Sequence, residues 1–424
     1  MILSFDACGA KDLEYLGQRP AFAEFMKDAS ICRNVKSVYP SLTYPAHTAI
    51  ITGKYPAHSG VTNNLKLQPE RYWNPDWCWY RRYVNGTTLY DEAQRHGYRT
   101  ASLFWPVTAS SGIDCNMPEI FANRKWQNQL ERSMFYGSGL YQLNMLYRYG
   151  RQIRGVSQPN LDNFTYDCLL RTIRKYHTDM EMVHFCDVDT LRHKHGVNNK
   201  YTMAALERHD KRLGGIISEL KKLGEYENTV IVLLGDHYQK DTHTILYPNY
   251  VLRKAGLIKT DGRFRVISYK AFSLNCDGAD YVYVKDRREL DNVREILYKW
   301  KNEEGSGIKC IYERKDIIAK GADPKCDFMI EAEDGYYFQD LMENRSMKVD
   351  DAGKYGQRAT HGYDPDDPDY RTFFMIKGPG VKKGISVPEM SLVDEGPTIA
   401  KIFGWNLGKT DGHVVSSIID PDII

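Results

Sequence analysis

Apolar runs of strand length alternate with amphipathic stretches of helix length along most of the chain. The strand-like runs include MILSFDA at the N-terminus, then YRTASLFW, MEMVHFCDVD and NTVIVLLGDH. The helix-like stretches cover residues 11–27, 89–97, 161–177 and 200–223. Continuously apolar strands separated by helices predict a mostly parallel sheet that helices cover on both faces. The expected fold class is therefore α/β.

The pattern changes after about residue 245, where the segments become shorter and more mixed. Residues 257–355 contain several short strand patterns and one helical pattern. The apolar run FFMIKGPG then returns at 373–380, and a last helix is expected near 396–403. No Pro/Gly/Ser-rich linker separates these parts. We therefore expect a single domain over residues 1–424 that carries a small α+β insertion at 257–355.

Charge, apolar runs and cysteine usage bear on which partners and which cellular compartment to expect. The formal net charge is +2 over 424 residues, so no global charge favours nucleic acid or an anionic membrane as a partner. No apolar run reaches the roughly 18 residues that a membrane span needs. The nine cysteines are scattered without CxxC pairs, and no secretory leader pattern precedes the first strand, so we expect a reducing, cytoplasmic compartment. The thirty tyrosines and seven tryptophans could pack in the core or line a pocket for a planar or apolar substituent.

Three of the predicted strands end in acidic residues. Asp6 ends the first strand, Asp187 and Asp189 end HFCDVDT, and Asp236 ends VIVLLGDH. In an open α/β sheet, ligands collect beyond the carboxyl ends of the strands. A single Asp at such a position can simply cap the next helix, but several carboxylates together need a cation. The repetition therefore favours a metal site.

Histidines stand close to these strand ends. Asp189 and His193 are four residues apart, within reach of one ion across a helical turn, and His237 directly follows Asp236. His361 stands shortly before the strand at 373–380, and mixed Asp and His ligands suit zinc. We interpret the other histidines as packed or surface residues: His47, His58, His96, His177, His184, His209, His243, His413 and, if its segment is helical, His195.

A nucleophile candidate occurs in the segment YPSLTYPAHTAIITGKYPAHSG. Thr43 precedes Pro45 and an amphipathic helix from Ala46 to Thr52, which Gly53 ends, so its hydroxyl lies at a helix N-terminus. Thr43 could be no more than the cap of this helix. Alternatively, the helix amides and dipole favour an alkoxide and a bound phosphate there, and zinc would lower the pKa of the hydroxyl enough for attack.

Taken together, these residues resemble the nucleotide pyrophosphatase/phosphodiesterase family, the type I phosphodiesterases of the alkaline-phosphatase superfamily. Asp6 is similar to the family's first-strand metal ligand, and SLTYPAHTAIITGKYPAHSGV to its nucleophile segment. Asn64 in VTNN is similar to the asparagine that holds a phosphate oxygen. TTLYDEAQRHGYRTASLFWP is similar to the stretch that ends in a Trp-Pro pair, here Trp105-Pro106. DTLRHKHG, GDH and THGYD complete the series in the family's order.

The resemblance implies an alkaline-phosphatase-like fold and a two-zinc hydrolase of phosphodiester or pyrophosphate bonds in nucleotide-type substrates. The implied zinc ligands are Asp189, His193 and His361 for one ion, and Asp6, Asp236, His237 and the Thr43 oxygen for the other. Thr43 would attack phosphorus in line, Asn64 would hold a phosphate oxygen, and water would hydrolyse the phosphothreonine. Tyr44, Asn64 and Trp105 are the expected substrate contacts. The expected partner is a small phosphodiester or nucleotide, not a nucleic-acid polymer or a membrane.

The chain departs from the family pattern beside the site. Val188 stands where the family usually has Pro, and Tyr238-Gln239 stand where Gly-Met commonly follows GDH, so both positions bear on substrate preference. Three other functions stay open on this scaffold. One is a phosphomonoesterase or phosphonate hydrolase, in which Lys66 would hold the terminal phosphate. Another is a glycerophosphodiester phosphodiesterase that grips a choline headgroup in an aromatic and acidic cage, and the last is a binding protein without activity.

Overall fold

The centre of the molecule is a nine-stranded sheet, in a computed structural model that describes residues 1–342, 344–351 and 353–421. The strand order is β18-β2-β17-β6-β1-β5-β3-β4, with β19 also beside β2. The strands are β1 (Ile2–Phe5), β2 (Ser30–Lys36), β3 (Thr100–Leu103), β4 (Cys115–Met117), β5 (Met180–Phe185), β6 (Ile231–Leu234), β17 (Thr372–Lys377), β18 (Ser386–Val387) and β19 (Met390–Ser391). All neighbouring pairs in this sheet are parallel except those of β17, which runs antiparallel to both β2 and β6. The predicted α/β class with a mostly parallel sheet is confirmed.

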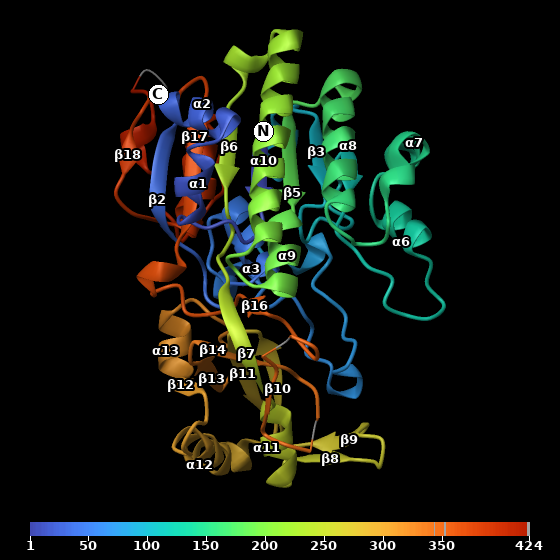
Figure 1. The fold of residues 1–424 in the computed structure, drawn as a ribbon, viewed down its shortest axis with the longest axis vertical. Coiled ribbons are helices and arrows are strands. Elements are labelled where there is room, and N and C mark those ends of the chain that lie inside the picture. Colours follow the sequence, from blue (N-terminus) through green and yellow to red (C-terminus); the bar gives the residue numbers. More distant parts are fainter. Residues whose placement is uncertain (343, 352, 422–424) are drawn as a thin grey trace.

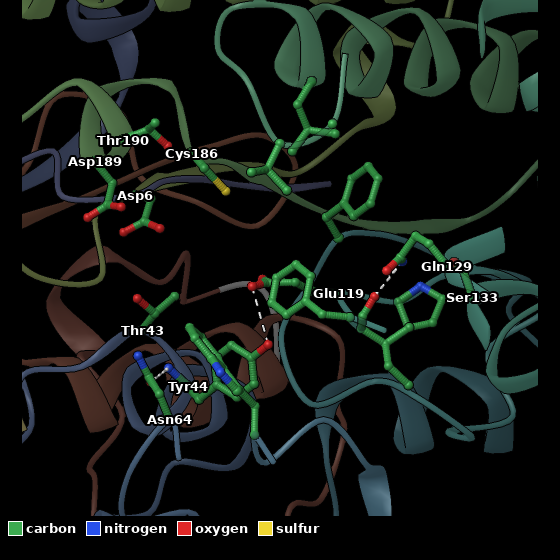
Figure 2. Close-up of a pocket in the computed structure, with 18 of the residues that line it drawn as sticks. Asp6, Thr43, Tyr44, Asn64, Glu119, Gln129, Ser133, Cys186, Asp189 and Thr190 are labelled. Carbon is green, nitrogen blue, oxygen red and sulfur yellow. Dashed lines mark hydrogen bonds between the residues drawn. The ribbon is translucent and has the colours of Figure 1, made fainter. Parts of the chain in front are cut away.

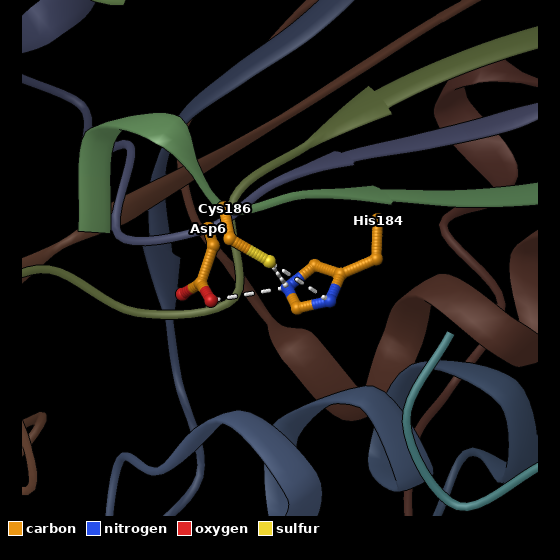
Figure 3. A group of neighbouring side chains, drawn as sticks. All are labelled: Asp6, His184 and Cys186. Carbon is orange, nitrogen blue, oxygen red and sulfur yellow. Dashed lines mark hydrogen bonds and ion pairs between the residues drawn. The ribbon is translucent and has the colours of Figure 1, made fainter. Parts of the chain in front are cut away.

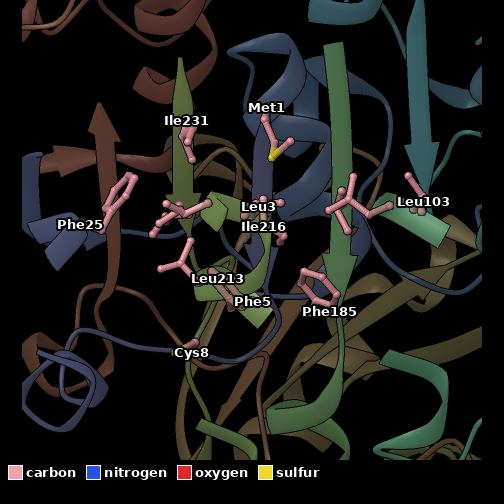
Figure 4. Close-up of a cluster of buried hydrophobic side chains, with 14 of the residues drawn as sticks. Met1, Leu3, Phe5, Cys8, Phe25, Leu103, Phe185, Leu213, Ile216 and Ile231 are labelled. Atoms are coloured by element: carbon pink, nitrogen blue, oxygen red, sulfur yellow. The ribbon is translucent and has the colours of Figure 1, made fainter. Parts of the chain in front are cut away.

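The central strand β1 is buried throughout because both faces of the sheet are covered. Its side chains alternate between two cores: Leu3 and Phe5 pack into one, and Ile2 packs into the other. Figure 4 shows the first of these cores, in which Phe5 and Phe185 from neighbouring strands lie beneath Leu213 and Ile216. A strand buried on both faces has no polar alternation, which explains the continuous apolar runs in the sequence.

Helices cover the two faces of the sheet as separate layers (Figure 1). The helices of the first layer are α1 (Asp12–Leu16), α2 (Pro20–Asp28), α8 (Asn160–Tyr176) and α10 (Lys200–Leu223). Those of the second are α3 (Thr43–Thr52), α5 (Leu89–Arg95) and α14 (Glu395–Ile402). Three further helices are α4 (Pro56–Ser59), α6 (Gln129–Tyr136) and α7 (Gly139–Tyr149), of which α6 and α7 project beside α8 at the edge of the molecule.

A second layer of smaller sheets lies beyond one edge of the main sheet, at the bottom of Figure 1. A four-stranded antiparallel sheet runs in the order β10-β11-β13-β12, and a second sheet groups β14, β7, β15 and β16. Its elements are β7 (Lys240–Leu246), α11 (Pro248–Lys254), β8 (Ile258–Thr260), β9 (Val266–Tyr269), β10 (Ala271–Cys276), β11 (Ala279–Val284), α12 (Leu290–Lys301), β12 (Ile308–Glu313), α13 (Arg314–Ala319), β13 (Phe328–Ala332), β14 (Gly335–Phe338), β15 (Met347–Val349) and β16 (Ala359–Thr360). Residues 257–355, where the insertion is expected, form most of this layer, together with β7, α11 and β16.

Most predicted elements occur close to their expected bounds. The helix expected at 200–223 is α10 with the same ends, whereas the helix expected at 11–27 is two helices, because α2 starts at Pro20 after the turn at Gly17. The sequence patterns did not reveal β2, α6 or α7. None of the helices in the described part of the chain combines the length and apolar character that a membrane crossing requires.

Candidate active site

The strand order brings the predicted acidic ligands to one edge of the sheet. β6, β1 and β5 are consecutive and parallel, so their carboxyl ends lie side by side. Asp6 follows β1, Asp236 follows β6, and the helix α9 (Asp187–His195) begins almost directly after β5. Acidic residues more than 200 positions apart in the sequence therefore meet beyond one edge.

A first group consists of Asp6, Asp236 and His237, whose ligand atoms lie within 4.8 Å of one another. His237 Nε2 is 3.4 Å from Asp6 Oδ1 and 3.2 Å from Asp236 Oδ2. Burial, together with the nearby carboxylate of Asp189, raises the pKa of Asp6 to about 6. Asp6 Oδ1 and Asp236 Oδ2 are buried and accept no hydrogen bond from the described residues. A cation would stabilise two such carboxylate oxygens.

A second group consists of Asp189, His193 and His361, again within 4.8 Å. Asp189 and His193 stand one turn apart on α9, with His193 Nε2 3.2 Å from Asp189 Oδ1 and His361 Nε2 4.0 Å from the same oxygen. Burial alone would raise the pKa of Asp189, but the facing His193 brings it down to about 2. The rings of His361 and His237 lie 4.2 Å apart, so the two groups are adjacent.

Thr43 is the first residue of α3, and the N-cap of this helix is Leu42, without a capping hydrogen bond from its side chain. The alternative that Thr43 serves as the cap is therefore excluded. Its Oγ1 lies 3.1 Å from His237 Nε2, beside the first group, and Thr43 lines the same cavity as Asp189. The hydroxyl thus stands at a helix N-terminus, next to the first Asp-His group and in a cavity that the second group also lines.

Asn64 and Tyr44 flank the Thr43 hydroxyl. The backbone N–H of Tyr44 donates to Asn64 Oδ1 at 2.8 Å, so the amide nitrogen of Asn64 is the part that can donate to a ligand. The Tyr44 hydroxyl donates to Glu119 Oε1 at 3.2 Å. Tyr44, Asn64 and Glu119 all line the cavity.

The structure corrects two expectations for side chains near the site. Trp105 is fully buried and is absent from the cavity lining; its ring packs edge-on against His47 at 4.7 Å. Trp105 therefore supports the site from behind and does not touch a substrate in the cavity. Lys66 likewise does not line the cavity, because its ammonium group lies over the Tyr83 ring at 3.8 Å.

The cavity beside these residues has a volume of about 1280 Å³. Figure 2 shows Thr43, Asp6 and Asp189 on one side of it, and Gln129 and Ser133 on the other. Trp77, Phe104 and Phe121 are among the aromatic residues that line it, and no Lys or Arg lines it in the described part of the chain. Thr43 and the Asp-His groups therefore face a large, aromatic-lined and anionic space.

A comparison with protein-family models identifies the family. The model for "Type I phosphodiesterase / nucleotide pyrophosphatase" matches residues 1–364. The chain belongs to this family. Its members are hydrolases of phosphodiester and pyrophosphate bonds, so the resemblance drawn from the sequence motifs is confirmed.

Named relatives of the type I phosphodiesterase family match at low identity. Bovine Bis(5'-adenosyl)-triphosphatase ENPP4 is 24% identical over 99% of this chain and 82% of the relative. The human Ectonucleotide pyrophosphatase/phosphodiesterase family member 1 is 22% identical over 56% of this chain, and the matched part is 23% of its length. The chain thus spans about a quarter of that longer relative.

Solved structures of the family share the fold. Murine ectonucleotide pyrophosphatase/phosphodiesterase 5 superposes with a TM-score of 0.69 and 15% identity, covering 99% of both chains. An inactive variant of the same murine protein, solved in complex with AMP, gives the same values. The alkaline-phosphatase-like fold predicted from the resemblance is therefore confirmed.

Three side chains beside the type I phosphodiesterase motifs were missed by the sequence analysis. His184 Nε2 lies 3.1 Å from Asp6 Oδ2, and Cys186 Sγ lies 3.6 Å from His184 Nδ1 (Figure 3). His184 Nδ1 also faces Glu119 Oε2 at 3.4 Å. The only signal was that His184 alternates with Cys186 along the strand that leads to α9. Their position against Asp6 depends on the pairing of β5 with β1.

Two further residues hold the second group. Gln239 Nε2 donates to Asp189 Oδ1. Gln239 is one of the two residues that replace the family's common Gly-Met pair, and here it orients a predicted metal ligand. Asp277, from the turn between β10 and β11, has its Oδ2 3.6 Å from His361 Nδ1. At this separation the carboxylate of Asp277 acts on His361 electrostatically and forms no hydrogen bond to Nδ1. The smaller layer therefore contributes directly to the site.

Proposed function

We propose that this protein is a two-zinc hydrolase that cleaves phosphodiester or pyrophosphate bonds in nucleotide-type substrates, with Thr43 as the nucleophile. The observation that carries the proposal is the position of Thr43 Oγ1, which lies 3.1 Å from His237 at the N-terminus of α3 and in the cavity that both Asp-His groups line. A hydroxyl that serves only packing has no reason to stand among unneutralised carboxylates.

The two groups fit a pair of zinc ions. Three mixed nitrogen and oxygen donors on each side, with room for a substrate oxygen, match the open coordination of catalytic zinc. We assign one ion to Asp189, His193 and His361, and the other to Asp6, Asp236, His237 and the Thr43 oxygen. Bound zinc would lower the pKa of a hydroxyl and neutralise phosphate charge.

The chain's own residues then account for the reaction. Thr43 Oγ1 bonds to phosphorus as the bond to the leaving oxygen breaks, and the hydroxyl proton is lost to solvent. The Asn64 amide, held by Tyr44 N, donates to a non-bridging oxygen as charge redistributes. Water hydrolyses the phosphothreonine and restores Thr43. The N-terminus of α3 adds favourable potential for the phosphate throughout.

The cavity lining favours a diester over a monoester. A monoester presents a doubly charged terminal phosphate, which needs cationic side chains in addition to the metals. No Lys or Arg lines the cavity among the described residues, and Lys66 is held against Tyr83. Trp77, whose ring packs edge-on at 5.3 Å against the fully buried Tyr44, provides an aromatic wall for a planar base.

A choline-type headgroup is a second candidate, which Glu119 favours. Its carboxylate lines the cavity next to Tyr44, Trp77 and Phe121, and an acidic group among aromatic faces suits a quaternary ammonium. In this case para-nitrophenyl phosphorylcholine would be the better substrate. Glu119→Gln would then raise KM for the choline ester more than for a nucleoside ester.

One comparison tests the proposed function. The zinc-loaded enzyme should hydrolyse the para-nitrophenyl ester of a nucleoside monophosphate faster than para-nitrophenyl phosphate. Faster cleavage of the monoester would contradict the diesterase assignment. Absence of both activities, together with no zinc bound after incubation, would leave only the binding-protein alternative.

A further inference from the structure

The cavity extends beyond the reactive groups into a space that we call the apolar arm. Its lining side chains are Phe104, Leu146, Ile153, Val156, Leu161 and Phe164. Phe104 directly follows β3, and the others come from α7, α8 and the connection between these two helices. With about 1280 Å³ in total, the cavity exceeds the roughly 300–1,000 Å³ of ordinary small-ligand pockets. The space is larger than a phosphate and one planar base require.

The polar side chains at the Gln129–Ser133 side of the cavity are already satisfied within the chain. Gln129 accepts from Ala122 N–H at 2.8 Å and donates to Ile120 O at 2.7 Å. Gln142 donates to Asn116 O at 3.1 Å and accepts from the Ser133 hydroxyl at 2.6 Å. With these groups engaged and no cation in the lining, this region offers little to a sugar or a chain of phosphates. An apolar occupant fits it.

The arm opens onto an exposed apolar surface, which we call the α6–α7 face. Its large apolar residues, with their exposed fractions, are Trp126 (82%), Leu130 (45%), Phe135 (80%), Leu140 (86%), Leu143 (50%), Tyr147 (86%) and Val156 (67%). Leu130 and Val156 line the cavity and are also exposed, so they connect the two features. Side chains of this kind rarely gather on a surface that only faces water.

The same segment is locally basic. Residues 124–158 contain six Lys or Arg and a single Glu, although the whole chain carries a formal charge of only +2. Lys125, Arg148, Arg151 and Arg154 are exposed in the same segment as these apolar side chains. Exposed Trp, Phe and Leu surrounded by cations are typical of helices that lie in the interface of an anionic bilayer.

We propose that the substrate is an amphiphilic phosphodiester drawn from a lipid surface, with its phosphorus at Thr43 and its apolar chain in the apolar arm. The proposal rests on the phosphodiesterase function above and specifies one substituent of the diester. It departs from the expectation, based on composition, that no membrane is a partner, because the overall charge hides a basic face.

A lipid surface fits the α6–α7 face better than a protein partner does. Leu130 and Val156 stand where the arm meets this face, so a protein seated there would close the entrance. A bilayer at the same position instead presents acyl chains to the opening. The basic residues match anionic headgroups, and the apolar residues reach the acyl boundary.

A chain-length series tests the substrate class. The zinc-loaded enzyme is assayed with para-nitrophenyl alkyl phosphates that carry methyl, butyl and octyl groups, all below their micelle concentrations. We expect kcat/KM to rise by about three- to four-fold for each buried methylene until the arm is filled. A flat series with good turnover of the methyl ester overturns this proposal alone. No turnover of any of the three alkyl esters or of a nucleoside ester overturns the proposed function instead.

Substitutions in the apolar arm test where the alkyl chain of the substrate binds. Ile153→Asp and, as an independent second site, Leu161→Asp should each reduce the octyl-to-methyl ratio of kcat/KM by at least about ten-fold, because a carboxylate would be buried against the chain. Ile153→Leu keeps the apolar lining and should keep the ratio. Thermal unfolding shows which variants are folded. An unchanged octyl-to-methyl ratio in a folded Asp variant would contradict the proposal that the alkyl chain of the substrate binds in the apolar arm.

Sedimentation with vesicles tests the lipid source. The zinc-loaded protein should bind vesicles of phosphatidylcholine mixed with phosphatidylserine, and Phe135→Ser combined with Leu140→Ser should weaken binding at least about ten-fold. Ile267→Ser, at a residue that is 70% exposed on the β8–β9 hairpin, is the matched control and should bind like wild type. A steep chain-length series without vesicle binding would assign the substrate to dissolved monomers and overturn the lipid surface as its source.

Discussion

The hydroxyl of Thr43 lies 3.1 Å from Nε2 of His237, although 194 residues separate the two in the sequence. The contact exists because α3 begins at Thr43 while His237 follows β6, beside β1 in the sheet. Thr43 has no capping role, since Leu42 is the N-cap. The position of the hydroxyl is thus set by the fold and is not needed by the helix.

Thr43→Ala should reduce kcat for the para-nitrophenyl nucleoside diester by at least about a thousand-fold, since it removes the attacking oxygen. Zinc content should remain near that of wild type, because the Asp and His donors remain. Steady-state kinetics and elemental analysis measure the two effects. Thr43→Ser retains a hydroxyl and should keep much more activity than Thr43→Ala; equal activity of wild type and Thr43→Ala would exclude Thr43 as the nucleophile.

Asp236→Asn and His361→Ala should each reduce bound zinc from about two to about one per chain, through different groups. Asp236 faces His237 and Asp6, whereas His361 faces Asp189. Inductively coupled plasma mass spectrometry gives the metal count. His195→Ala is the matched control, because His195 stacks on Tyr201 at 4.1 Å and lies outside both groups. Two zinc ions in either ligand variant would refute the assignment.

Asn64→Ala should lower kcat/KM by about a hundred-fold, because one donor to the developing charge is lost. The zinc content should not change, since Asn64 belongs to neither Asp-His group. Asn64→Asp keeps the acceptor for Tyr44 N–H but replaces the donor by a charge, so it should be no better than Asn64→Ala. Near wild-type activity in Asn64→Asp would contradict the donor role.

Arg192→Met should destabilise the protein by about 3–5 kcal/mol. Arg192 is fully buried and its Nη2 lies 2.6 Å from Asp12 Oδ1, so removing it leaves a buried charge without its partner. Urea unfolding at fixed zinc measures the free energy of unfolding. Lys27→Met removes an exposed ion pair with Glu24 and should cause no measurable change. A similar small effect for Arg192→Met would show that the buried pair is dispensable.

Glu331→Gln should change how stability depends on pH. Burial raises the pKa of Glu331 from 4.5 to about 8, although the Tyr39 hydroxyl donates to its carboxylate at 2.6 Å. Between these values the folded chain binds the proton more tightly than the unfolded chain, so Glu331 makes the free energy of unfolding fall as pH rises, by at most about 1.4 kcal/mol per unit. Glu331→Gln should therefore gain stability relative to wild type from pH 5 to pH 8. A constant difference across this range, measured by urea unfolding at fixed zinc, would contradict the raised pKa.

The sequence predicted the parts of the site that follow from strand ends. Asp6 and Asp236 close apolar runs, and Asp189 with His193 has helical spacing, so one rule about parallel sheets placed them together. His184 could not be found in this way, because it lies within an apolar strand and its role depends on which strand lies beside it. Trp105 was misplaced for a different reason. A motif gives the position of a residue in the sequence but not the direction of its side chain.

The apolar arm also could not be predicted from the sequence patterns. Its lining combines a residue after β3, Phe104, with residues such as Ile153 and Phe164 from segments that follow much later. Each has an ordinary apolar neighbourhood in the sequence. The exposed positions on α6 and α7 resemble core positions by residue type, because Leu140 and Tyr147 give no sign of facing solvent until the helices are placed.

The antiparallel strand β17 has a consequence for how the chain is made. It fills the gap between β2 and β6, whose residues are synthesised long before Thr372–Lys377 leave the ribosome. Until then, an incomplete chain has β2 without any partner strand and β6 with one open edge, because β6 pairs only with β1. Their exposed backbone groups can pair with other chains. Truncation before residue 372 should therefore yield aggregates and not a smaller enzyme, and chaperones should protect this late stage of biosynthesis.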